Sequence, residues 1–368
     1  MTYLDFGATS LRKPPQVAAA TVWAMGNCAN PGRGGYRAAM TAAETVYRCR
    51  ERAGRLFGCH PEQVVFTANC THGLNIAIRS LVKPGMRVAI SGFEHNAVTR
   101  PLQGLGAEKI IAGRKLFDWE DTLNRFADAL KTAEAAVFTH VSNVFGYILP
   151  VEEMAALCRD KGIPFIIDGA QSAGSIPSSL EKLGADFVAM PGHKGLLGPQ
   201  GTGLLLCGRA GEPLIMGGTG SESIRQDMPD DLPERLEAGT LNVPGIAGLS
   251  AGLAFLEKTG VEQIGRREHR EVLRSARGLE DLGCRVYVGP HQAGTLSFLP
   301  EGDCEEFARA LGHRGVAVRA GLHCAPLAHE SAGTLESGTV RVSFGWNGEK
   351  AQTEALLSGV SKLRGRKS

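Results

Sequence analysis

An acidic residue and a lysine each follow an apolar run, in a pattern that could support covalent cofactor chemistry. Asp168 ends the run Phe165-Ile-Ile-Asp and is followed by Gly-Ala-Gln171. A carboxylate at the tip of a buried strand is unfavourable unless it meets a cationic partner. A pyridinium nitrogen would be such a partner, since the acid would keep that nitrogen protonated and the ring an electron sink. Capping of the next helix, or binding of a magnesium ion, would account for the same residue.

Lys194 stands in the sequence Pro191-Gly-His-Lys-Gly, directly after a second apolar run. A lysine that is desolvated beside a cationic ring has a lowered pKa and becomes a nucleophilic amine. The neighbouring glycines allow the backbone to approach a ligand closely. A lysine after a strand is otherwise an ordinary surface residue. One strand–helix–strand unit separates Lys194 from Asp168, which predicts that the two strand tips are neighbours.

Three further segments place polar residues after apolar runs. The stretch Asn69-Cys70-Thr71 opens a helical segment, where free backbone N–H groups and the Thr71 hydroxyl suit a phosphate. Ordinary N-capping by Asn69 or Thr71 is the alternative. His95 and Asn143 stand in similar places, and an imidazole there could stack on a flat ring. An acid, an amine, a phosphate site and a stacking ring together predict pyridoxal 5'-phosphate (PLP).

Short apolar runs alternate with amphipathic stretches from about residue 40 to 210, which predicts an α/β fold with a mainly parallel sheet covered on both faces. The expected strands are 64–67, 87–90, 136–141, 164–168, 187–190 and 203–207, and the expected helices are 38–56, 71–81, 119–131, 151–161 and 178–183. Ligands of such sheets bind at the carboxyl ends of the strands, where the polar residues above stand.

After about Pro244 the pattern becomes that of a smaller α+β domain. Helical stretches at 246–259 and 260–282 precede strand-like runs at 285–288, 295–299, 316–319 and 339–344. A chain of 368 residues is also expected to form two domains rather than one.

Composition narrows the class of protein. The apolar fraction of 43% and the charged fraction of 21% are typical of a soluble globular protein. A net charge of +2 gives no case for a nucleic-acid or membrane-surface partner. The first residues lack the pattern of a secretion leader, and no run is long and apolar enough to span a membrane, so we expect a cytoplasmic protein. The nine cysteines are scattered without a Cys-x-x-Cys pair, which favours free thiols over a zinc site.

The order of these motifs resembles the class V (fold type I) PLP-dependent aminotransferase family, in particular its cysteine desulfurase and selenocysteine lyase branch. The resemblance runs from Tyr3-Leu-Asp-Phe-Gly-Ala-Thr-Ser10 to Val340–Phe344, and its most specific motifs are Asp168-Gly-Ala-Gln171, Gly192-His-Lys194 and Arg319-Ala-Gly-Leu-His-Cys324. It implies a large domain with a mainly parallel seven-stranded sheet and a smaller α+β C-terminal domain. The implied boundaries are an N-terminal segment at 1–20 that packs with the small domain, a PLP-binding domain at 21–245 and a small domain at 246–368 that carries Cys324.

The resemblance also implies a role for each motif residue. Lys194 would hold PLP as a Schiff base and then move protons. The other implied cofactor contacts are Asp168 to the ring nitrogen, Gln171 to the ring O3' oxygen, His95 on the ring face, Asn143 to O3' or to substrate, Cys70, Thr71 and His193 at the phosphate, and Thr240 at the phosphate of a neighbouring subunit. Arg341, with Arg319 of the Cys324 motif, would bind the substrate carboxylate. A homodimer with shared active sites follows.

Cys324 distinguishes reactions within this family. A thiolate near a PLP–cysteine adduct can take the substrate sulfur as a persulfide and leave alanine, and His323 or His95 could act as the base that the thiol needs. The short segment from Cys324 to Arg341 resembles the group II (SUF-like) branch more than the NifS/IscS-like branch. Such a segment would pass sulfur to a docked acceptor protein or to a small thiol. The chain departs from the family pattern at Pro191 and Cys70, where hydroxyl side chains are usual.

The prediction is therefore a PLP-dependent cysteine desulfurase that converts L-cysteine to L-alanine. A selenocysteine lyase, a cysteine C–S lyase and an aminotransferase on the same fold are alternatives, because fold alone does not fix the reaction. A non-catalytic sulfur-relay module is a further alternative, although Lys194, Asp168 and Arg341 all argue against it.

Overall fold

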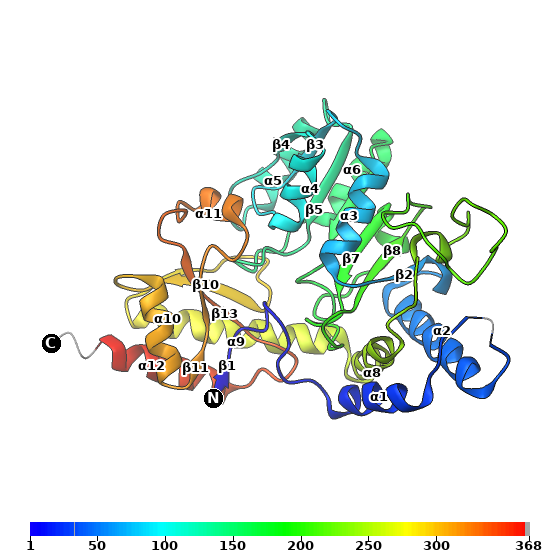
Figure 1. Ribbon diagram of the computed structural model, residues 1–368. Helices are drawn as coiled ribbons and strands as arrows, with labels where there is room; N and C mark the ends of the chain where they lie inside the picture. Colours follow the sequence, from blue (N-terminus) through cyan, green and yellow to red (C-terminus); the bar gives the residue numbers. More distant parts are fainter. Residues whose placement is uncertain (33, 365–368) are drawn as a thin grey trace.

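A seven-stranded sheet forms the centre of the computed structural model, which describes residues 1–32 and 34–364 (Figure 1). In spatial order its strands are β2 (Val64–Thr67), β8 (Gly203–Cys207), β7 (Phe187–Pro191), β6 (Phe165–Asp168), β5 (Ala135–Thr139), β3 (Arg87–Ile90) and β4 (Glu108–Ile111). All neighbouring pairs are parallel except the two that involve β8. The predicted α/β class and mainly parallel sheet are confirmed.

Strand direction sets where the functional residues gather. Because β8 runs antiparallel to both β2 and β7, β2 points the same way as β7 and the strands beside it. The carboxyl ends of β2, β7, β6, β5 and β3 therefore lie along one edge of the sheet. These are the strands that precede the predicted polar residues, so the topology brings those residues to one edge.

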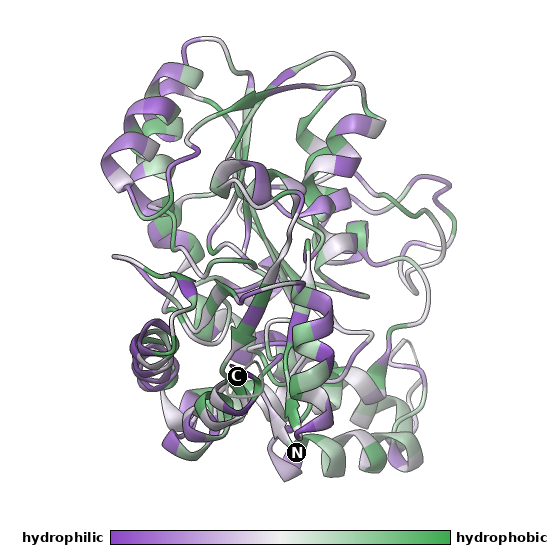
Figure 2. Cartoon of the chain, turned by 90° about the vertical axis from the view of Figure 1, so that its left-hand side faces the viewer, coloured by the Kyte–Doolittle hydropathy of each residue, from purple (hydrophilic) through white to green (hydrophobic). Residues whose placement is uncertain are grey.

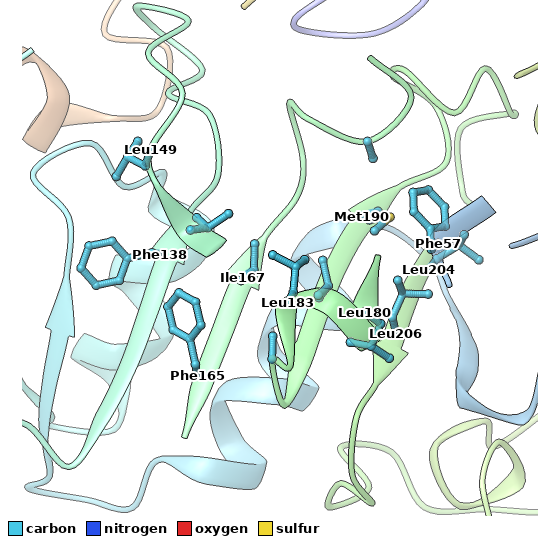
Figure 3. Close-up of a cluster of buried hydrophobic side chains, with 14 of the residues drawn as sticks. Phe57, Phe138, Leu149, Phe165, Ile167, Leu180, Leu183, Met190, Leu204 and Leu206 are labelled. Atoms are coloured by element: carbon cyan, nitrogen blue, oxygen red, sulfur yellow. The ribbon is translucent and has the colours of Figure 1, made fainter. Parts of the chain in front are cut away.

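Apolar side chains alternate between the two faces of the sheet and bury both. Phe165 and Ile167 of β6 pack in one core, while Ile166 between them packs in the other. Figure 3 shows part of the first core, where Phe138, Phe165 and Ile167 lie beside side chains from other elements. Burial on both faces explains why the strands read as continuous apolar runs rather than alternating ones.

Helices cover both faces of this sheet. They are α2 (Arg37–Phe57), α3 (Cys70–Leu81), α4 (Asn96–Gly104), α5 (Trp119–Ala129), α6 (Val151–Lys161), α7 (Leu180–Leu183) and α8 (Val243–Thr259). A further helix, α1 (Pro15–Asn27), packs against α8 and α2. Figure 2 shows peripheral helices that carry both hydrophilic and hydrophobic residues, as expected of helices with one face on a core. β4, a short edge strand that opens with charged residues, was not among the predicted strands, and α4, which contains Pro101, was not among the helices named as examples.

A second, four-stranded antiparallel sheet has the order β12 (Arg319–Gly321), β13 (Thr339–Ser343), β10 (Thr295–Leu299) and β9 (Arg285–Tyr287). The helices of this region are α9 (Val261–Asp281), α10 (Cys304–His313), α11 (Pro326–Ala332) and α12 (Lys350–Arg364). The last four residues of the predicted small domain lie outside the described part of the chain.

The predicted single strand at 316–319 is wrong, because the chain changes partners within it. β11 (Val316–Ala317) pairs with the N-terminal β1 (Thr2–Tyr3), whereas β12 pairs with β13. The N-terminal segment thus adds a strand to the C-terminal region.

Helix α8 packs against α1 and α2, although the predicted small domain begins within this helix. No helix in the described residues is long and apolar enough to cross a membrane.

Candidate active site

A cavity of about 250 Å³ lies at the carboxyl edge of the central sheet. Its walls come from the tips of β2, β3, β5, β6 and β7, from the N-terminal segment and from β12, β13 and the loop that follows β12. The predicted site residues that line it are Cys70, Thr71, His95, Asn143, Asp168, Gln171, His193, Lys194, Arg319, His323, Cys324 and Arg341. Thr240 is exposed and lines a separate hollow beside Arg50 and Glu237.

Asp168 is a buried acid with one oxygen left open. It ends β6, and only 2% of its surface is exposed. Its Oδ1 accepts hydrogen bonds from the Ala170 N–H at 2.9 Å and from the Cys70 thiol at 3.4 Å. Its Oδ2 has no partner among the described residues. A buried carboxylate with an open oxygen fits a cationic ring nitrogen.

Lys194 faces Asp168 across the same cavity without a hydrogen bond from its amine to any described residue. Burial lowers the pKa of Lys194, the Arg341 charge lowers it further, and the Asp168 charge raises it. The backbone of Lys194 is held by the Ser10 hydroxyl, which donates to its carbonyl at 2.6 Å. An amine with a lowered pKa on a fixed backbone is suited to attack an aldehyde and to carry protons.

The sequence predicts an anion site at the N-terminus of α3, which lies at the cavity. Asn69 caps the helix, because its Oδ1 accepts from the His72 N–H at 2.9 Å. The N–H groups of Cys70 and Thr71 have no acceptor among the described residues, and both residues line the cavity. These N–H groups can bind an anion. The Cys70 thiol turns to Asp168 instead, where burial and the acid raise its pKa well above the ordinary value.

Two of the cavity histidines, His95 and His193, are oriented by hydrogen bonds at their ring nitrogens. His95 caps α4, and its Nδ1 accepts from the Ala97 N–H at 3.0 Å, which leaves the proton of the neutral ring on Nε2. His193 Nδ1 lies 3.0 Å from the Thr9 hydroxyl, which itself donates to the His193 carbonyl. Burial lowers the pKa of His95 and lowers that of His193 to about 4, so both rings are neutral at pH 7.

Two amide side chains of the cavity, Gln171 and Asn143, each have hydrogen-bonding atoms without a partner among the described residues. Gln171 donates one N–H to the Gly7 carbonyl at 3.0 Å and keeps a second N–H free. Asn143 donates to the His323 carbonyl at 2.7 Å, and its Oδ1 has no partner. Gln171 can therefore donate to a ligand oxygen. Asn143 likewise keeps a second N–H that can donate, and its open Oδ1 can accept.

The two arginines of the cavity differ in whether their guanidinium groups already have partners. Arg341 is buried, and it donates to Asp5 Oδ1 at 2.6 Å and to the Asn143 carbonyl at 3.0 Å. Arg319 is exposed and forms no ion pair with a described residue. Arg319 thus presents the more available guanidinium, while Arg341 is held in position by Asp5 and by the Asn143 carbonyl.

Cys324 is the one exposed cysteine of the nine. It lies in the turn between β12 and α11, and the Asn96 N–H donates to its carbonyl at 2.8 Å. The neighbouring His323 imidazole is buried and its Nε2 lies 3.2 Å from the Thr339 carbonyl. Burial lowers the pKa of His323 to about 2, so this ring does not act as a base at neutral pH.

Comparison with known proteins agrees with this geometry. Residues 2–356 match the model of the aminotransferase class-V family. The chain belongs to this family. The resemblance that the motifs predicted is thereby confirmed.

Within the class-V family, the chain is similar to proteins named as cysteine desulfurases. It is 32% identical to a probable cysteine desulfurase from Pyrococcus abyssi, over 98% of this chain and 94% of that one. It superimposes with a TM-score of 0.90 and 32% identity on an apo cysteine desulfurase from Thermococcus onnurineus NA1, over 98% and 94% of the two chains. A crystal structure of the cysteine desulfurase CsdA from Escherichia coli gives a TM-score of 0.85 at 26% identity, over 99% and 95%.

Two residues beside the candidate active site were not among the site residues that the sequence predicted. Asp5 pairs with Arg341 although 336 positions separate them, and only the position of Asp5 in the N-terminal motif hinted at a role. Glu94 precedes His95 and is fully buried. Its carboxyl group accepts from the Ser91 N–H at 3.2 Å and from the Thr139 N–H at 3.0 Å, which joins the tips of β3 and β5.

Glu94→Gln is expected to change how stability depends on pH. Burial raises the pKa of Glu94 from 4.5 to about 8, so the folded protein holds this proton more tightly than the unfolded chain does. Glu94 therefore lowers the free energy of unfolding as pH rises from about 4.5 to 8, by up to about 1.4 kcal/mol per pH unit. Urea titrations at pH 5 and 7.5 should show that the glutamine variant loses less stability than the wild type. Parallel losses in both proteins would contradict the assignment.

Proposed function

We propose that this protein is a PLP-dependent cysteine desulfurase that converts L-cysteine to L-alanine and receives the sulfur on Cys324. The observation that carries the proposal is the shared cavity of Lys194, Asp168 and Cys324, in which Cys324 is the one exposed thiol of the chain. The likeness to cysteine desulfurases at 32% identity over nearly the whole chain supports the same reaction. A relay module without catalysis would not need the amine and the acid.

The residues present fit PLP. We propose that Lys194 binds its aldehyde, that Asp168 meets its ring nitrogen through the open Oδ2, and that Gln171 donates to its O3' oxygen. His95 would cover the ring face, and the N–H groups of Cys70 and Thr71 with the Thr71 hydroxyl would bind the phosphate. His193, which is neutral and bonded to Thr9, would lie beside the phosphate. When bound, PLP supplies an electron sink that stabilises negative charge on the substrate carbon next to its amine.

Residues of the chain position the substrate and move its proton. We propose that Arg319 binds the L-cysteine carboxylate with its unpaired guanidinium, and that Arg341, held by Asp5, completes the positive site. Asn143 Oδ1 can accept from the substrate amine. Lys194 has the lowered pKa needed to take the proton from the α-carbon and to return one to the product.

The sulfur transfer balances between substrate and protein. The Cys324 thiolate attacks the sulfur of bound L-cysteine, an S–S bond forms and the carbon–sulfur bond breaks. Overall, L-cysteine and the Cys324 thiol give L-alanine and a Cys324 persulfide. His95 lies on the loop that binds the Cys324 backbone through Asn96, and as a neutral ring at the cavity it is the available proton carrier.

The Cys324 turn also suggests how sulfur leaves. Its backbone is bonded to Asn96 on one side and, through His323, to Asn143 and Thr339 on the other. A thiol on such a turn stays at the cavity, so the acceptor must approach it there. We propose a docked sulfur-acceptor protein or a small thiol as the partner.

We further propose a homodimer in which Thr240 of each subunit completes the site of the other. Thr240 is exposed outside the cavity of its own chain, which supports a role elsewhere. Large apolar residues are exposed on α1, at the start of and along α2, and on the segment after β8, namely Val22, Trp23, Met25, Tyr36, Met40, Tyr47, Ile215, Met216 and Ile224. Light scattering should give twice the 39.0 kDa of one chain, and the mass of one chain would refute the shared site.

Product analysis tests the reaction. The PLP-loaded protein is incubated with L-cysteine, with and without a reductant, and alanine, pyruvate and sulfide are quantified. Equal amounts of alanine and sulfide in the presence of the reductant are expected. Pyruvate would indicate a C–S lyase, a requirement for a keto-acid partner would indicate an aminotransferase, and turnover of L-selenocysteine alone would indicate a selenocysteine lyase.

A further inference from the structure

The turn that carries Cys324 has an unusual backbone. His323 and Cys324 have φ values of 49° and 58°, so two successive residues with side chains adopt the left-handed conformation. Their side chains make that conformation unfavourable. A turn of this kind persists only if contacts from outside it hold it in place, because its own residues favour another conformation.

Hydrogen bonds from three other segments supply such contacts. Asn143 Nδ2 donates to the His323 carbonyl at 2.7 Å, and the Asn96 N–H donates to the Cys324 carbonyl at 2.8 Å. His323 Nε2 lies 3.2 Å from the Thr339 carbonyl. The Asn143 bond is the shortest of these, and it comes from a buried side chain that lines the cavity.

The position of Asn143 is fixed at its other end as well. Its carbonyl accepts from Arg341 Nη1 at 3.0 Å. Its amide orientation is unambiguous, because only the NH₂ group can face the His323 carbonyl. Asn143 therefore connects the buried arginine, the loop after β5 and the Cys324 turn within one set of contacts.

We propose that Asn143 is a positioning residue that holds the turn of residues 322–325 in its left-handed conformation and so fixes the Cys324 thiol at the cavity. This role is separate from contact with cofactor or substrate, since the N–H that makes it is turned away to a backbone carbonyl. Its catalytic consequence rests on the proposed function, but the fixation of the turn does not.

Asn143→Ala removes the anchor, and Asn96→Ala is the matched control. Asn96 bonds the same turn through its backbone N–H, which alanine retains, and its side chain accepts a hydrogen bond from the Thr99 hydroxyl at 3.4 Å rather than bonding the turn. Hydrogen–deuterium exchange and iodoacetamide alkylation of Cys324, read by peptide mass spectrometry without PLP, report the turn directly. We expect exchange in peptides covering 321–326 to be at least about 10-fold faster in Asn143→Ala and near wild type in Asn96→Ala.

A second variant tests the hydrogen bond itself. Asn143→Asp can donate to the His323 carbonyl only while its carboxyl group is protonated, so it should protect the turn at low pH and lose that protection as pH rises. A variant that merely disturbed packing would show no such rescue. If Asn143→Ala proves unfolded by circular dichroism, Asn143→Asp alone decides the question through this pH dependence.

The possible outcomes test the positioning role of Asn143 separately from the proposed desulfurase activity. Wild-type exchange in Asn143→Ala, or no rescue by Asn143→Asp at low pH, would overturn the positioning role whatever the enzyme does. If the turn loosens, single-turnover sulfur transfer to Cys324 should fall by about 100-fold, the size of effect expected from displacing a reacting group by about 1 Å. A loosened turn in Asn143→Ala, together with a wild-type protein that forms no alanine, would support the anchor and refute the desulfurase.

Discussion

Replacing Cys324 with alanine is expected to reduce alanine formation from L-cysteine by at least about 1,000-fold, which is typical of the loss of a catalytic nucleophile. Cys324 is the one exposed thiol of the chain and lines the cavity with Lys194. The variant should still bind PLP and give the same visible absorption spectrum, because Cys324 is not among the residues that we expect to hold the cofactor. The measurements are alanine and sulfide in steady state, and the mass of the Cys324 peptide after a single turnover.

Cys59→Ala is the matched control for this result. Cys59 is half-buried, and burial raises its pKa to about 11, so it is a poor nucleophile at neutral pH. The control should keep wild-type turnover. Undiminished alanine or sulfide production by Cys324→Ala would remove the persulfide from the proposal and indicate a lyase or an aminotransferase.

Lys194→Ala is expected to abolish turnover, with a loss of at least about 10,000-fold, because one side chain serves both as the covalent anchor of PLP and as the proton carrier. The pKa of Lys194 is lowered first by burial and then by Arg341, so its amine is free at lower pH than that of an ordinary lysine. Wild-type protein reduced with borohydride should give a peptide with pyridoxyl-modified Lys194. The alanine variant should give no modified peptide although it can still bind PLP reversibly.

Lys161→Ala is a suitable control, because Lys161 is an exposed lysine in the last turn of α6. It should retain both turnover and the modified Lys194 peptide. Modification at another lysine in the wild type would contradict the assignment of Lys194. Turnover by Lys194→Ala at more than about 1% of wild type would show that another group carries the proton.

Local sequence could predict much of the sheet edge at which the candidate active site lies. Strand 64–67, strand 87–90 and strand 203–207 were predicted with their observed bounds, because residues buried on both faces of a sheet form continuous apolar runs. Asp168 and Lys194 stand directly after such runs, and strands of one direction end at one edge. Their meeting in one cavity follows because β6 and β7 are parallel neighbours, as one strand–helix–strand unit between them predicts.

Local apolar runs could not predict the edge strand β4, nor the division of 316–319 into β11 and β12. The first is polar at its start and short, and the second depends on which strand lies opposite each residue. Strand pairing of this kind is settled by distant partners, namely β1 for β11 and β13 for β12. A local pattern contains no information about those partners.

The finer properties of the site were also decided by tertiary packing. Sequence predicted both Arg341 and Arg319 for the substrate carboxylate, and the fold adds that Asp5 pairs with Arg341 while Arg319 forms no ion pair with a described residue. Sequence offered His323 as a base, but burial makes it a neutral ring bonded toward Thr339. Residue types and strand order therefore determined which chemistry this protein carries. Hydrogen-bond partners and burial, which arise only when distant segments pack together, decided which atoms remain free to perform it.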